Sequence, residues 1–581
     1  MKTTFTYDSY WTYETLKSNI FKLKELFAKL VSVESICTTP EGRNIFALTI
    51  TSPDSDPLKK PAFYVDGGTH AGEVTGTMAA MHTADYLLTN YGSDDGVTKL
   101  LDQMTIYVVP RVSPDGAETY LTTPYSIRSA DRVYKPEAGG IYEKDLDGDD
   151  VVRMMRIKTP YGAWKIDPQD GSTMTLRKPD DTEGTFYDIF TEGMLESFDG
   201  DENLKMKKKD WALDFNRNYP FGWFPDGRQP GAGPYPLYNP ETHAMVDFIL
   251  AHPNICCVST NHTSGGLILY PPGTKPSTKA HPEDIDLLKT LAEMGQEATG
   301  YVPLNIFDSF IHDQENYDSG AFDDWCFQNE GIPAYTVELW DLDSKVGVPR
   351  NWGGQKEDMK TVLKRFNACM KWVKEHAPQY YKDWTPVEHP QFGEVEVGGF
   401  NWKFTIQNPP EDMLLSVLEP MTKFMISLAK AAPHLAIDSF TAKKVKDGVY
   451  EVEAIIGNHG YMSTSLSESA KDLKKDTPVK VELSGGTILS PQTSFDIPEL
   501  QGYGSSKTFM SFYGNLTTQA AARAKKKVTW IVLAAEGTKL ELSVSNAKAG
   551  CATASIVLRD CEYFDKLSIK LDFQQFVSQT H

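Results

Sequence analysis

The chain has 581 residues, of which 40% are hydrophobic and 24% charged, and its formal net charge at pH 7 is −21. This composition is typical of a soluble globular protein, and the length predicts more than one domain. The acidity argues against polyanionic partners, so we expect neither nucleic acid nor an anionic membrane surface to bind.

Predicted strands and helices alternate along the first part of the chain. Residues 61–68 (PAFYVDGG) form an apolar run that ends in two glycines, and residues 73–92 have a helical pattern. The alternation continues with strands at 104–112, 254–262 and 332–340 and helices at 241–252, 282–300 and 356–377. This order predicts an α/β fold, with a mixed central sheet flanked by helices and ligand groups gathered beyond the carboxyl ends of its strands.

The segment from about residue 133 to residue 209 interrupts the alternation. It is charged and rich in glycine and aspartate, so we interpret it as an insertion or an elaborated loop region. Within it, Asp145, Asp147 and Asp149 have the spacing of a calcium-binding loop. The sixth and twelfth positions lack the glycine and glutamate that such loops need. A solvated acidic turn is therefore the favoured interpretation, and a Ca²⁺ site is the alternative.

The character of the sequence changes after about residue 433. Apolar and polar residues alternate in short segments between turns, as in KKVTWIVLAAEGTKLELSVSN. This pattern predicts an antiparallel β-sandwich. We therefore expect an α/β domain at residues 1–432, carrying the insertion at about 133–209, and a C-terminal all-β sandwich domain at residues 433–581.

Three residues with metal-binding side chains lie near the ends of predicted strands. His70 and Glu73 follow the first of these strands in the sequence HAGE, a pattern that chance produces about once in a chain of this length. His262 ends another strand, within STNHTS. A catalytic zinc ion usually takes three protein ligands and leaves one position for water, so the three residues are a candidate zinc site. For His262 alone, a capping or hydrogen-bonding role is the alternative.

Two further features fit a hydrolytic metal site. Glu338 lies within the apolar run AYTVELW, where burying a carboxylate is costly unless a metal, a cation or a catalytic role is nearby. Asn216 and Arg217 lie in the aromatic sequence DFNRNYP, and an arginine in such a setting suits the capture of a carboxylate. A structural salt bridge is the alternative role for the arginine.

The order and surroundings of these segments resemble the zinc carboxypeptidases related to pancreatic carboxypeptidase A. HAGE resembles the zinc motif of that family, and STNHTS resembles its third ligand. Three further segments also resemble the family: VVPRVSPDGAE, DFNRNYP and SGAFDDWCFQNEGIPAYTVELWD. The resemblance covers residues 8–430 apart from the insertion, and five segments in the right order carry it.

The resemblance implies the family fold and a metallocarboxypeptidase, an enzyme that removes single amino acids from the C-terminus of a peptide. His70, Glu73 and His262 would hold one Zn²⁺ ion. Glu338 would act as the general base and later as the proton donor. The implied partner is a peptide substrate with a free C-terminal carboxylate.

The resemblance also implies which residues bind the substrate. Arg128 falls where the family has the arginine that polarises the scissile carbonyl, and Arg132 is a nearby competitor for this role. Asn216 and Arg217 would bind the terminal carboxylate of the peptide.

Three positions depart from the family pattern. Gly72 stands where an arginine is common. Tyr317 is the candidate for the tyrosine that caps the substrate, but it lies one residue late, and Asn316 stands at the expected place. Asp323 lies where the family lines the pocket for the terminal side chain, which predicts selection of Lys or Arg by charge pairing. A helix-capping or salt-bridging role is the alternative, because Asp324 adjoins it.

Other functions fit the same sequence. A protein with this fold could act on cell-wall peptides or on acylated amino acids, and an inactive relative could serve as a binding module. The presence of all three ligand positions and of Glu338 argues against the inactive relative. The N-terminal residues do not have the pattern of a signal peptide, so we expect a cytoplasmic location, or a secreted one if a leader preceded this chain.

Overall fold

The computed structural model describes the chain except for residues 137, 198–203, 211, 312, 353–356 and 560–581. The chain forms two compact units. The first unit consists of Met1–Pro57, Ala62–Lys430 and Ser467–Leu473, and the second of Leu58–Pro61, Ala431–Leu466 and Lys474–His581. Among the described residues, no helix combines the length and the apolar character that a membrane-spanning segment needs.

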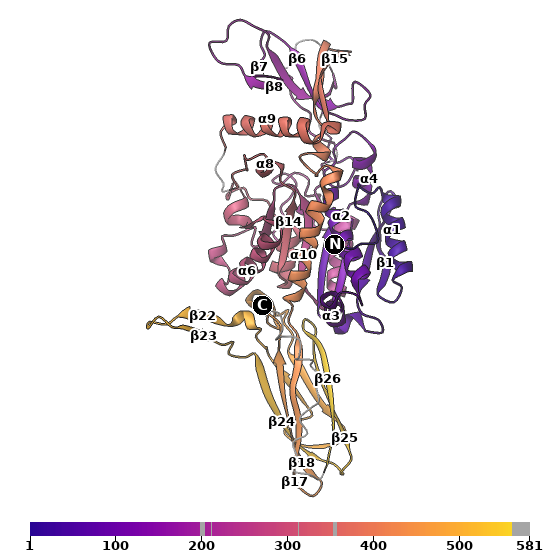
Figure 1. Cartoon of the computed structure of the whole chain (residues 1–581), viewed down its shortest axis with the longest axis vertical. Helices are drawn as coiled ribbons and strands as arrows, with labels where there is room; N and C mark the ends of the chain where they lie inside the picture. The colour runs from indigo at the N-terminus through magenta and orange to yellow at the C-terminus, as the bar shows by residue number, and fades with distance from the viewer. Residues whose placement is uncertain (137, 198–203, 211, 312, 353–356, 560–581) are drawn as a thin grey trace, which may run out of the picture. The chain divides into compact units, whose positions relative to one another are not determined.

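A mixed eight-stranded sheet forms the centre of the first unit (Figure 1). Its order is β1-β2-β4-β3-β11-β14-β12-β13, and the neighbours β4, β3, β11 and β14 run parallel. These four strands are almost entirely buried, which explains why they read as continuous apolar runs. The strands are β1 (Val31–Thr38), β2 (Asn44–Ile50), β3 (Ala62–Gly67), β4 (Thr105–Val109), β11 (Ile255–Thr263), β12 (Leu267–Tyr270), β13 (Val302–Asn305) and β14 (Ala334–Leu339).

Helices flank this sheet, as the sequence predicted. Helices α2 and α10 pack against each other and against β3 and β11, while α7 packs against β11 and β14. Gly76 allows α2 to approach β11 closely, because a Cβ atom there would lie 2.3 Å from the carbonyl oxygen of Asn261. The helices are α1 (Tyr13–Leu26), α2 (Val74–Asn90), α3 (Asp95–Gln103), α4 (Pro114–Thr122), α5 (Pro240–Ala251), α6 (Pro282–Thr299), α7 (Phe322–Glu330), α8 (Leu342–Lys345), α9 (Met359–His376) and α10 (Leu414–Lys430).

The predicted insertion contributes strands to a second sheet, which lies at the top of Figure 1. Its order is β15-β16-β6-β9-β7-β8, so two of its strands come from a segment that follows α9. Met155, Val395 and Val397 form its small buried core. The sequence did not reveal these strands, because most residues of β6, β7, β8, β9 and β15 are at least partly exposed and form no continuous apolar run. They are β6 (Met154–Lys158), β7 (Trp164–Asp167), β8 (Asp170–Leu176), β9 (Tyr187–Thr191), β15 (Tyr381–His389) and β16 (Gly393–Phe400), and β5 (Ile141–Glu143) pairs separately with β10 (Gly193–Leu195).

The second unit is built from antiparallel sheets, in agreement with the predicted β-sandwich. The four-stranded sheets β17-β18-β24-β20 and β21-β19-β25-β26 share one hydrophobic core around Trp530. Their strands are β17 (Leu435–Lys446), β18 (Val449–Asn458), β19 (Val479–Ser484), β20 (Thr487–Ser490), β21 (Ser494–Ile497), β24 (Lys525–Leu533), β25 (Lys539–Asn546) and β26 (Gly550–Val557). The short helix α11 (Glu468–Asp472) belongs to the first unit, which no sequence pattern indicated. The domain boundary at residue 433 stays a prediction.

Candidate metal centre

Adjacent parallel strands bring the three predicted ligands together. His70 and Glu73 lie in the turn between β3 and α2, and His262 is the penultimate residue of β11. Because the carboxyl ends of β3 and β11 meet at the same edge of the sheet, the turn and the strand end face each other. All three side chains are buried.

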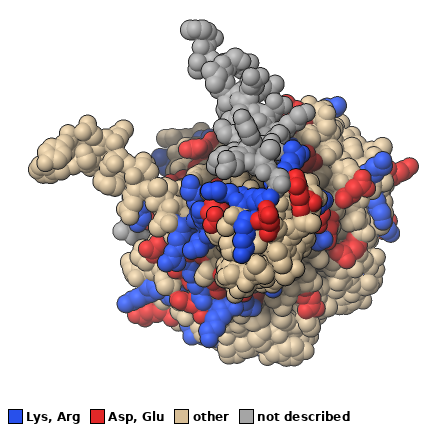
Figure 2. Space-filling model, turned by 90° about the horizontal axis from the view of Figure 1, so that it is seen from below, with Lys and Arg blue, Asp and Glu red and all other residues tan. Residues whose placement is uncertain are grey.

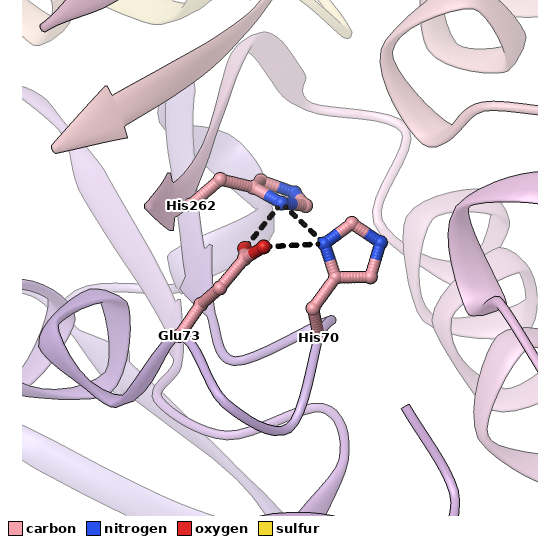
Figure 3. Close-up of side chains that lie close together, drawn as sticks. All are labelled: His70, Glu73 and His262. Atoms are coloured by element: carbon pink, nitrogen blue, oxygen red, sulfur yellow. Dashed lines mark hydrogen bonds and ion pairs between the residues drawn. The ribbon is translucent and has the colours of Figure 1, made fainter. Parts of the chain in front are cut away.

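The donor atoms of these residues converge on one point (Figure 3). His70 Nδ1 lies 2.9 Å from Glu73 Oε1 and 3.1 Å from His262 Nδ1, and His262 Nδ1 lies 2.8 Å from Glu73 Oε2. Two imidazole nitrogens and one carboxylate form a ligand set that zinc commonly takes.

The polar atoms of the cluster also fit a metal ion. Glu73 Oε2 is buried and makes no hydrogen bond of good geometry, despite its closeness to His262. Burial raises the pKa of the Glu73 carboxyl, but the charges of His70 and His262 outweigh burial and hold the pKa well below its ordinary range. An ionised carboxylate with an unsatisfied oxygen beside two imidazoles is the state that a divalent cation would bind.

Asp214, which the sequence analysis missed, orients His70. It precedes the short helix Phe215–Arg217, and its Oδ1 lies 3.0 Å from His70 Nε2. This contact holds one ring nitrogen of His70 and leaves the other, Nδ1, facing the cluster, as carboxylates commonly do behind metal-binding histidines. The one feature of the sequence that could have pointed to Asp214 is its position at the start of DFNRNYP, two residues before Asn216.

Arg128 forms an ion pair with Asp214, the carboxylate that contacts His70. Its Nε donates to Asp214 Oδ2 at 2.9 Å, and its guanidinium lies 3.7 Å from Glu73 Oε1. Its side chain is 42% exposed, so Arg128 also faces solvent. Arg132, the competing candidate, instead forms an ion pair with Glu241 at 2.7 Å. The structure therefore brings Arg128, and not Arg132, to the cluster.

Glu338 lies beside the cluster on the neighbouring strand. Strands β11 and β14 are parallel, and their register places Glu338 opposite His262. Side chains of paired residues point to the same face of a sheet, so Glu338 and His262 are neighbours there. Burial, reinforced by the negative charge of Glu73, raises the pKa of Glu338 to about 8.

The predicted carboxylate-binding residues are held by the backbone and by an acid. Asn216 Oδ1 accepts a hydrogen bond from the amide of Phe322 at 2.9 Å, which ties this loop to the start of α7. Arg217 donates to Asp318 Oδ2 at 2.8 Å, and the Asp318 side chain is 62% exposed. Arg217 is thus engaged in the salt bridge that the sequence offered as its alternative, with a partner that faces solvent.

Tyr317 is not joined to the cluster by any contact among the described residues. Its ring packs against Phe224 and Phe307, with centroid distances of 5.6 and 5.7 Å, and the guanidinium of Arg228 lies 5.5 Å from its centroid. Its role as the substrate-capping tyrosine stays a prediction.

Asp323 and Asp324 are both buried at the start of α7 but point to different partners. Asp323 Oδ2 accepts a hydrogen bond from Thr336 Oγ1 at 2.7 Å, so Asp323 faces β14 two residues before Glu338. Asp324 instead accepts from the amide of Gly273. Burial raises the pKa of both carboxyls, that of Asp324 to about 7.

Another buried acid, Asp66, lies on β3 in the same row of the central sheet as Thr336, the partner of Asp323. The strand registers place Asp66, Thr260 and Thr336 side by side, one row below His262 and Glu338. Asp66 Oδ1 is buried without a hydrogen-bond partner, and burial raises the pKa of this carboxyl to about 6. Sequence analysis missed Asp66 because an aspartate before two glycines is indistinguishable from a turn residue.

Asn408 fixes the turn that carries Glu73. Its Nδ2 donates to the carbonyl oxygen of Gly72 at 2.7 Å, and its Oδ1 accepts from the amide and the hydroxyl of Thr75 at 3.0 and 2.8 Å. Asn408 is fully buried, so these bonds are shielded from water. A Cβ atom added at Gly72 would lie 2.8 Å from the side chains of Tyr120 and Gln407. These two side chains therefore fill the space that an arginine side chain at position 72 would need.

Two basic side chains pair with the other predicted metal cluster. The carboxylates of Asp145, Asp147 and Asp149 lie close together, as their spacing suggested. Lys382 Nζ lies 2.7 Å from Asp147 and 2.9 Å from Asp149, and Arg153 also pairs with Asp149. Two of the three carboxylates therefore have basic partners, as expected for a solvated acidic turn, and the Ca²⁺ site stays a prediction.

Comparison with known proteins identifies the first unit. A family model described as zinc carboxypeptidase matches residues 16–149 and 195–351, which include the three ligands and Glu338. The chain belongs to the zinc carboxypeptidase family. The unmatched residues 150–194 lie within the predicted insertion, and a model described only as a domain of unknown function matches residues 434–557.

Curated relatives include both peptidases and an inactive protein. Inactive metallocarboxypeptidase ECM14 of Saccharomyces cerevisiae is 33% identical over 25% of this zinc carboxypeptidase-family chain and 33% of its own length. Carboxypeptidase A5 of Macaca fascicularis is 22% identical over 58% of this chain and 61% of its own length. The chain therefore spans between a third and about three fifths of these relatives.

Solved structures of related proteins show a distant likeness. Thrombin activatable fibrinolysis inhibitor aligns with a TM-score of 0.42 and 16% identity over 73% of this chain and 74% of its own. Carboxypeptidase A from Helicoverpa armigera aligns with a TM-score of 0.38 and 18% identity over 64% of this chain and 74% of its own.

Proposed function

We propose that this protein is a zinc metallocarboxypeptidase that hydrolyses the C-terminal peptide bond of peptides. The observation that carries the proposal is the placement of Glu338 beside His262, with the three ligand side chains converging at the same sheet edge. A binding module would not need the half-buried carboxylate of Glu338 next to the buried carboxylate of Glu73, because their mutual repulsion costs stability.

The residues of the site divide the chemistry between them. A zinc ion held by His70, Glu73 and His262 would polarise the scissile carbonyl and lower the pKa of a water molecule. Glu338 accepts the proton of the attacking water and delivers it to the amine that leaves. Burial raises the pKa of Glu338 toward the operating pH, which is the range in which a carboxyl group serves both as general base and as general acid.

Cationic side chains would hold the substrate in place. Arg128 has a partly exposed side chain beside Glu73, and its guanidinium would stabilise negative charge on the carbonyl oxygen. Asn216 and Arg217 would bind the terminal carboxylate, for which Arg217 exchanges its exposed partner Asp318. Tyr317 would cap the substrate after a rearrangement of its aromatic contacts.

We further propose that the enzyme prefers a basic C-terminal residue. Asp66 is buried one row below His262 and Glu338, about 7 Å along the strands, a distance that a lysine or arginine side chain spans. Asp323, on α7, is hydrogen-bonded to Thr336 of the same row. Neither carboxylate forms an ion pair with a lysine or arginine among the described residues. An incoming cation would supply the missing partner.

A single digest of a peptide pool distinguishes a carboxypeptidase from the alternative functions. The intact chain is loaded with zinc and incubated with a mixed peptide pool, and the products are read by mass spectrometry beside Glu338→Gln and a chelator control. We expect stepwise loss of single C-terminal residues, mainly Lys and Arg, and a loss of on the order of 10²–10⁴-fold in kcat for Glu338→Gln. Zinc content of the variant should equal that of the wild type.

Two outcomes would overturn parts of this proposal. Release of bulky apolar residues in place of Lys and Arg would remove the preference attributed to Asp323. Bound zinc without peptide cleavage would favour a same-fold amidohydrolase or a cell-wall peptide carboxypeptidase, and the absence of both zinc and cleavage would favour a non-catalytic relative.

A further inference from the structure

Among the described residues, a β-hairpin in the second unit pairs only with itself. Strands β22 (Lys507–Met510) and β23 (Leu516–Gln519) form a two-stranded sheet that joins neither of the two larger sheets of that unit. A single hairpin is at best marginally stable in water. None of the described residues in the hydrophobic core of this unit comes from the hairpin, so burial in that core does not stabilise it.

The end of this hairpin is apolar and exposed. Phe512 is 97% exposed, Tyr513 87% and Leu516 84%, and Met510 and Phe509 are more than half exposed. Single exposed apolar residues are ordinary, but a continuous cluster of large ones marks a surface that binds something. In Figure 2, the arm on the left, which carries the hairpin, shows neither blue nor red side chains at its far end.

The apolar residues of the hairpin gather at the end near its turn, where they lie on both faces of the two-stranded sheet. Met510 pairs with Leu516 near the turn, and Phe509 pairs with Thr517 on the opposite face. The pair at the base is polar, Lys507 with Gln519. A hairpin that docked flat in a protein groove would be apolar on one face only, whereas this one is apolar at its tip on both faces.

The base of the hairpin is basic in an otherwise acidic chain. Residues 500–535 contain no aspartate or glutamate and five basic residues, although the chain as a whole has a net charge of −21. The basic residues are Lys507, Arg523, Lys525, Lys526 and Lys527. Of these, Lys527 forms an ion pair with Glu453, while Arg523, Lys525 and Lys526 are exposed.

Backbone contacts connect these cations to the hairpin. The hydroxyl of Ser506 accepts a hydrogen bond from the amide of Ala521 at 3.1 Å, and the carbonyl of Arg523 accepts one from the amide of Gln501 at 3.0 Å. The hairpin thus continues through Arg523 into β24, which begins at Lys525. The cations lie at the base of the arm, and the aromatic side chains lie at its end.

We propose that this hairpin inserts its tip into the interface of an anionic lipid surface. Aromatic and aliphatic side chains at the tip would enter the boundary between headgroups and acyl chains, and the basic residues at the base would contact the anionic headgroups. Lys507 lies three residues from Met510, about 10 Å along the strand, which matches the depth to which interfacial segments bury.

The acidity of the whole chain does not oppose this contact. Charges separated by more than about 8–10 Å are screened at physiological ionic strength, so the local charge of the arm decides the interaction. The sequence analysis expected no membrane partner on the basis of the net charge, which averages over this segment. The proposal is independent of the peptidase activity.

Vesicle flotation of the intact chain tests the proposal. We expect binding to vesicles of equimolar phosphatidylcholine and phosphatidylglycerol, little binding to phosphatidylcholine alone, and weaker binding at high salt. The triple variant Phe512→Ser, Tyr513→Ser and Leu516→Ser should lower the partition coefficient by about tenfold or more. Tyr161→Ser is the control, because Tyr161 is 90% exposed in the first unit.

Other outcomes identify a different occupant or none. Equal binding of the wild type and the triple variant to the anionic vesicles would overturn the role of the tip, and a wild type that floats with neither vesicle would overturn the proposal. If light scattering shows a dimer that the triple variant converts to a monomer, the tip binds a second copy of the chain instead. Because these side chains are exposed, circular dichroism should show the variant folded.

Discussion

At the scale of single residues, the candidate metal centre depends on side chains that do not bind the metal themselves. His70 has two ring nitrogens, and only the one that faces Glu73 and His262 can serve as a ligand. Asp214 contacts the other nitrogen and is itself held by Arg128. The orientation of one ligand is therefore decided by a chain of contacts that begins outside the ligand set.

Replacing Asp214 with asparagine should weaken zinc binding. The substitution removes the negative charge behind His70, so we expect the zinc affinity to fall by about 10–100-fold. Competition with a chromophoric chelator measures this change directly. Asp318→Asn is the matched control, because Asp318 contacts Arg217 and not a ligand, and an equal fall in both variants would contradict the role of Asp214.

Asn408 should contribute to zinc affinity through the backbone. Asn408→Ala removes the hydrogen bonds to Gly72 and Thr75 on either side of Glu73, so we expect a lower zinc affinity and a loss of stability of about 1–3 kcal/mol. Zinc competition and thermal denaturation measure the two effects separately.

Asn458 offers the control for this variant. It is buried in the second unit and makes a similar set of bonds, with donors to Met462 and Leu500 and acceptors for His434 and Gly460. Asn458→Ala should lower stability to a similar extent and leave zinc affinity unchanged. Unchanged zinc affinity in Asn408→Ala as well would show that Asn408 is structural only.

At the scale of secondary-structure elements, the end of α4 is held by a buried amine. Lys403 Nζ donates to the carbonyl oxygens of Tyr120 and Thr123, at 2.6 and 2.7 Å, and lies 4.3 Å from the centroid of the Tyr120 ring. These carbonyls are at the C-terminus of the helix, where a donor is otherwise lacking. Lys403 also lines a cavity of about 630 Å³ between α4 and the insertion.

This amine should make stability depend on pH. Burial lowers the pKa of Lys403 to about 7, whereas an unfolded chain has a lysine pKa of about 10.4. Between these values the unfolded chain binds more protons, so stability rises as the pH rises from about 7 to about 10. The Tm of the wild type minus that of Lys403→Met should therefore be larger at pH 9 than at pH 7. An equal difference at the two pH values would contradict a depressed pKa.

At the scale of the whole molecule, the metal centre lies in one of the two units. His70, Glu73, His262 and Glu338 all belong to the first unit, and the second unit has its own core around Trp530. A ligand that binds only the native state stabilises only the unit that folds around it.

Calorimetry with and without zinc should separate the two units. We expect two transitions, of which zinc raises one by several degrees and leaves the other in place. Leu542→Ala, in the core of the second unit, should lower the transition that zinc does not move. A single transition that zinc shifts as a whole would show that the two units unfold together.

Much of the architecture could be read from the sequence because it follows from local patterns. Continuous apolar runs predicted the buried parallel strands β3, β4, β11 and β14 within a few residues, and alternation predicted the antiparallel second unit. The second sheet of the first unit escaped prediction, since β6 and β16 pair across about 240 residues and no local pattern encodes such pairing.

The sequence by itself placed His70, Glu73 and His262 at the ends of two predicted strands and so made them a candidate ligand set, because apolar runs and the turns after them are local patterns. The pairing of β3 with β11 in the folded chain brings the three side chains together. Tertiary structure decided which residues support it. Asp214 and Asn408 are 144 and 336 residues away from their partners His70 and Gly72, and no local pattern encodes such contacts. The sequence could not tell whether Arg128 or Arg132 lies at the cluster either, because this depends on which acid each guanidinium contacts in the folded chain. Arg128 contacts Asp214, and Arg132 contacts Glu241.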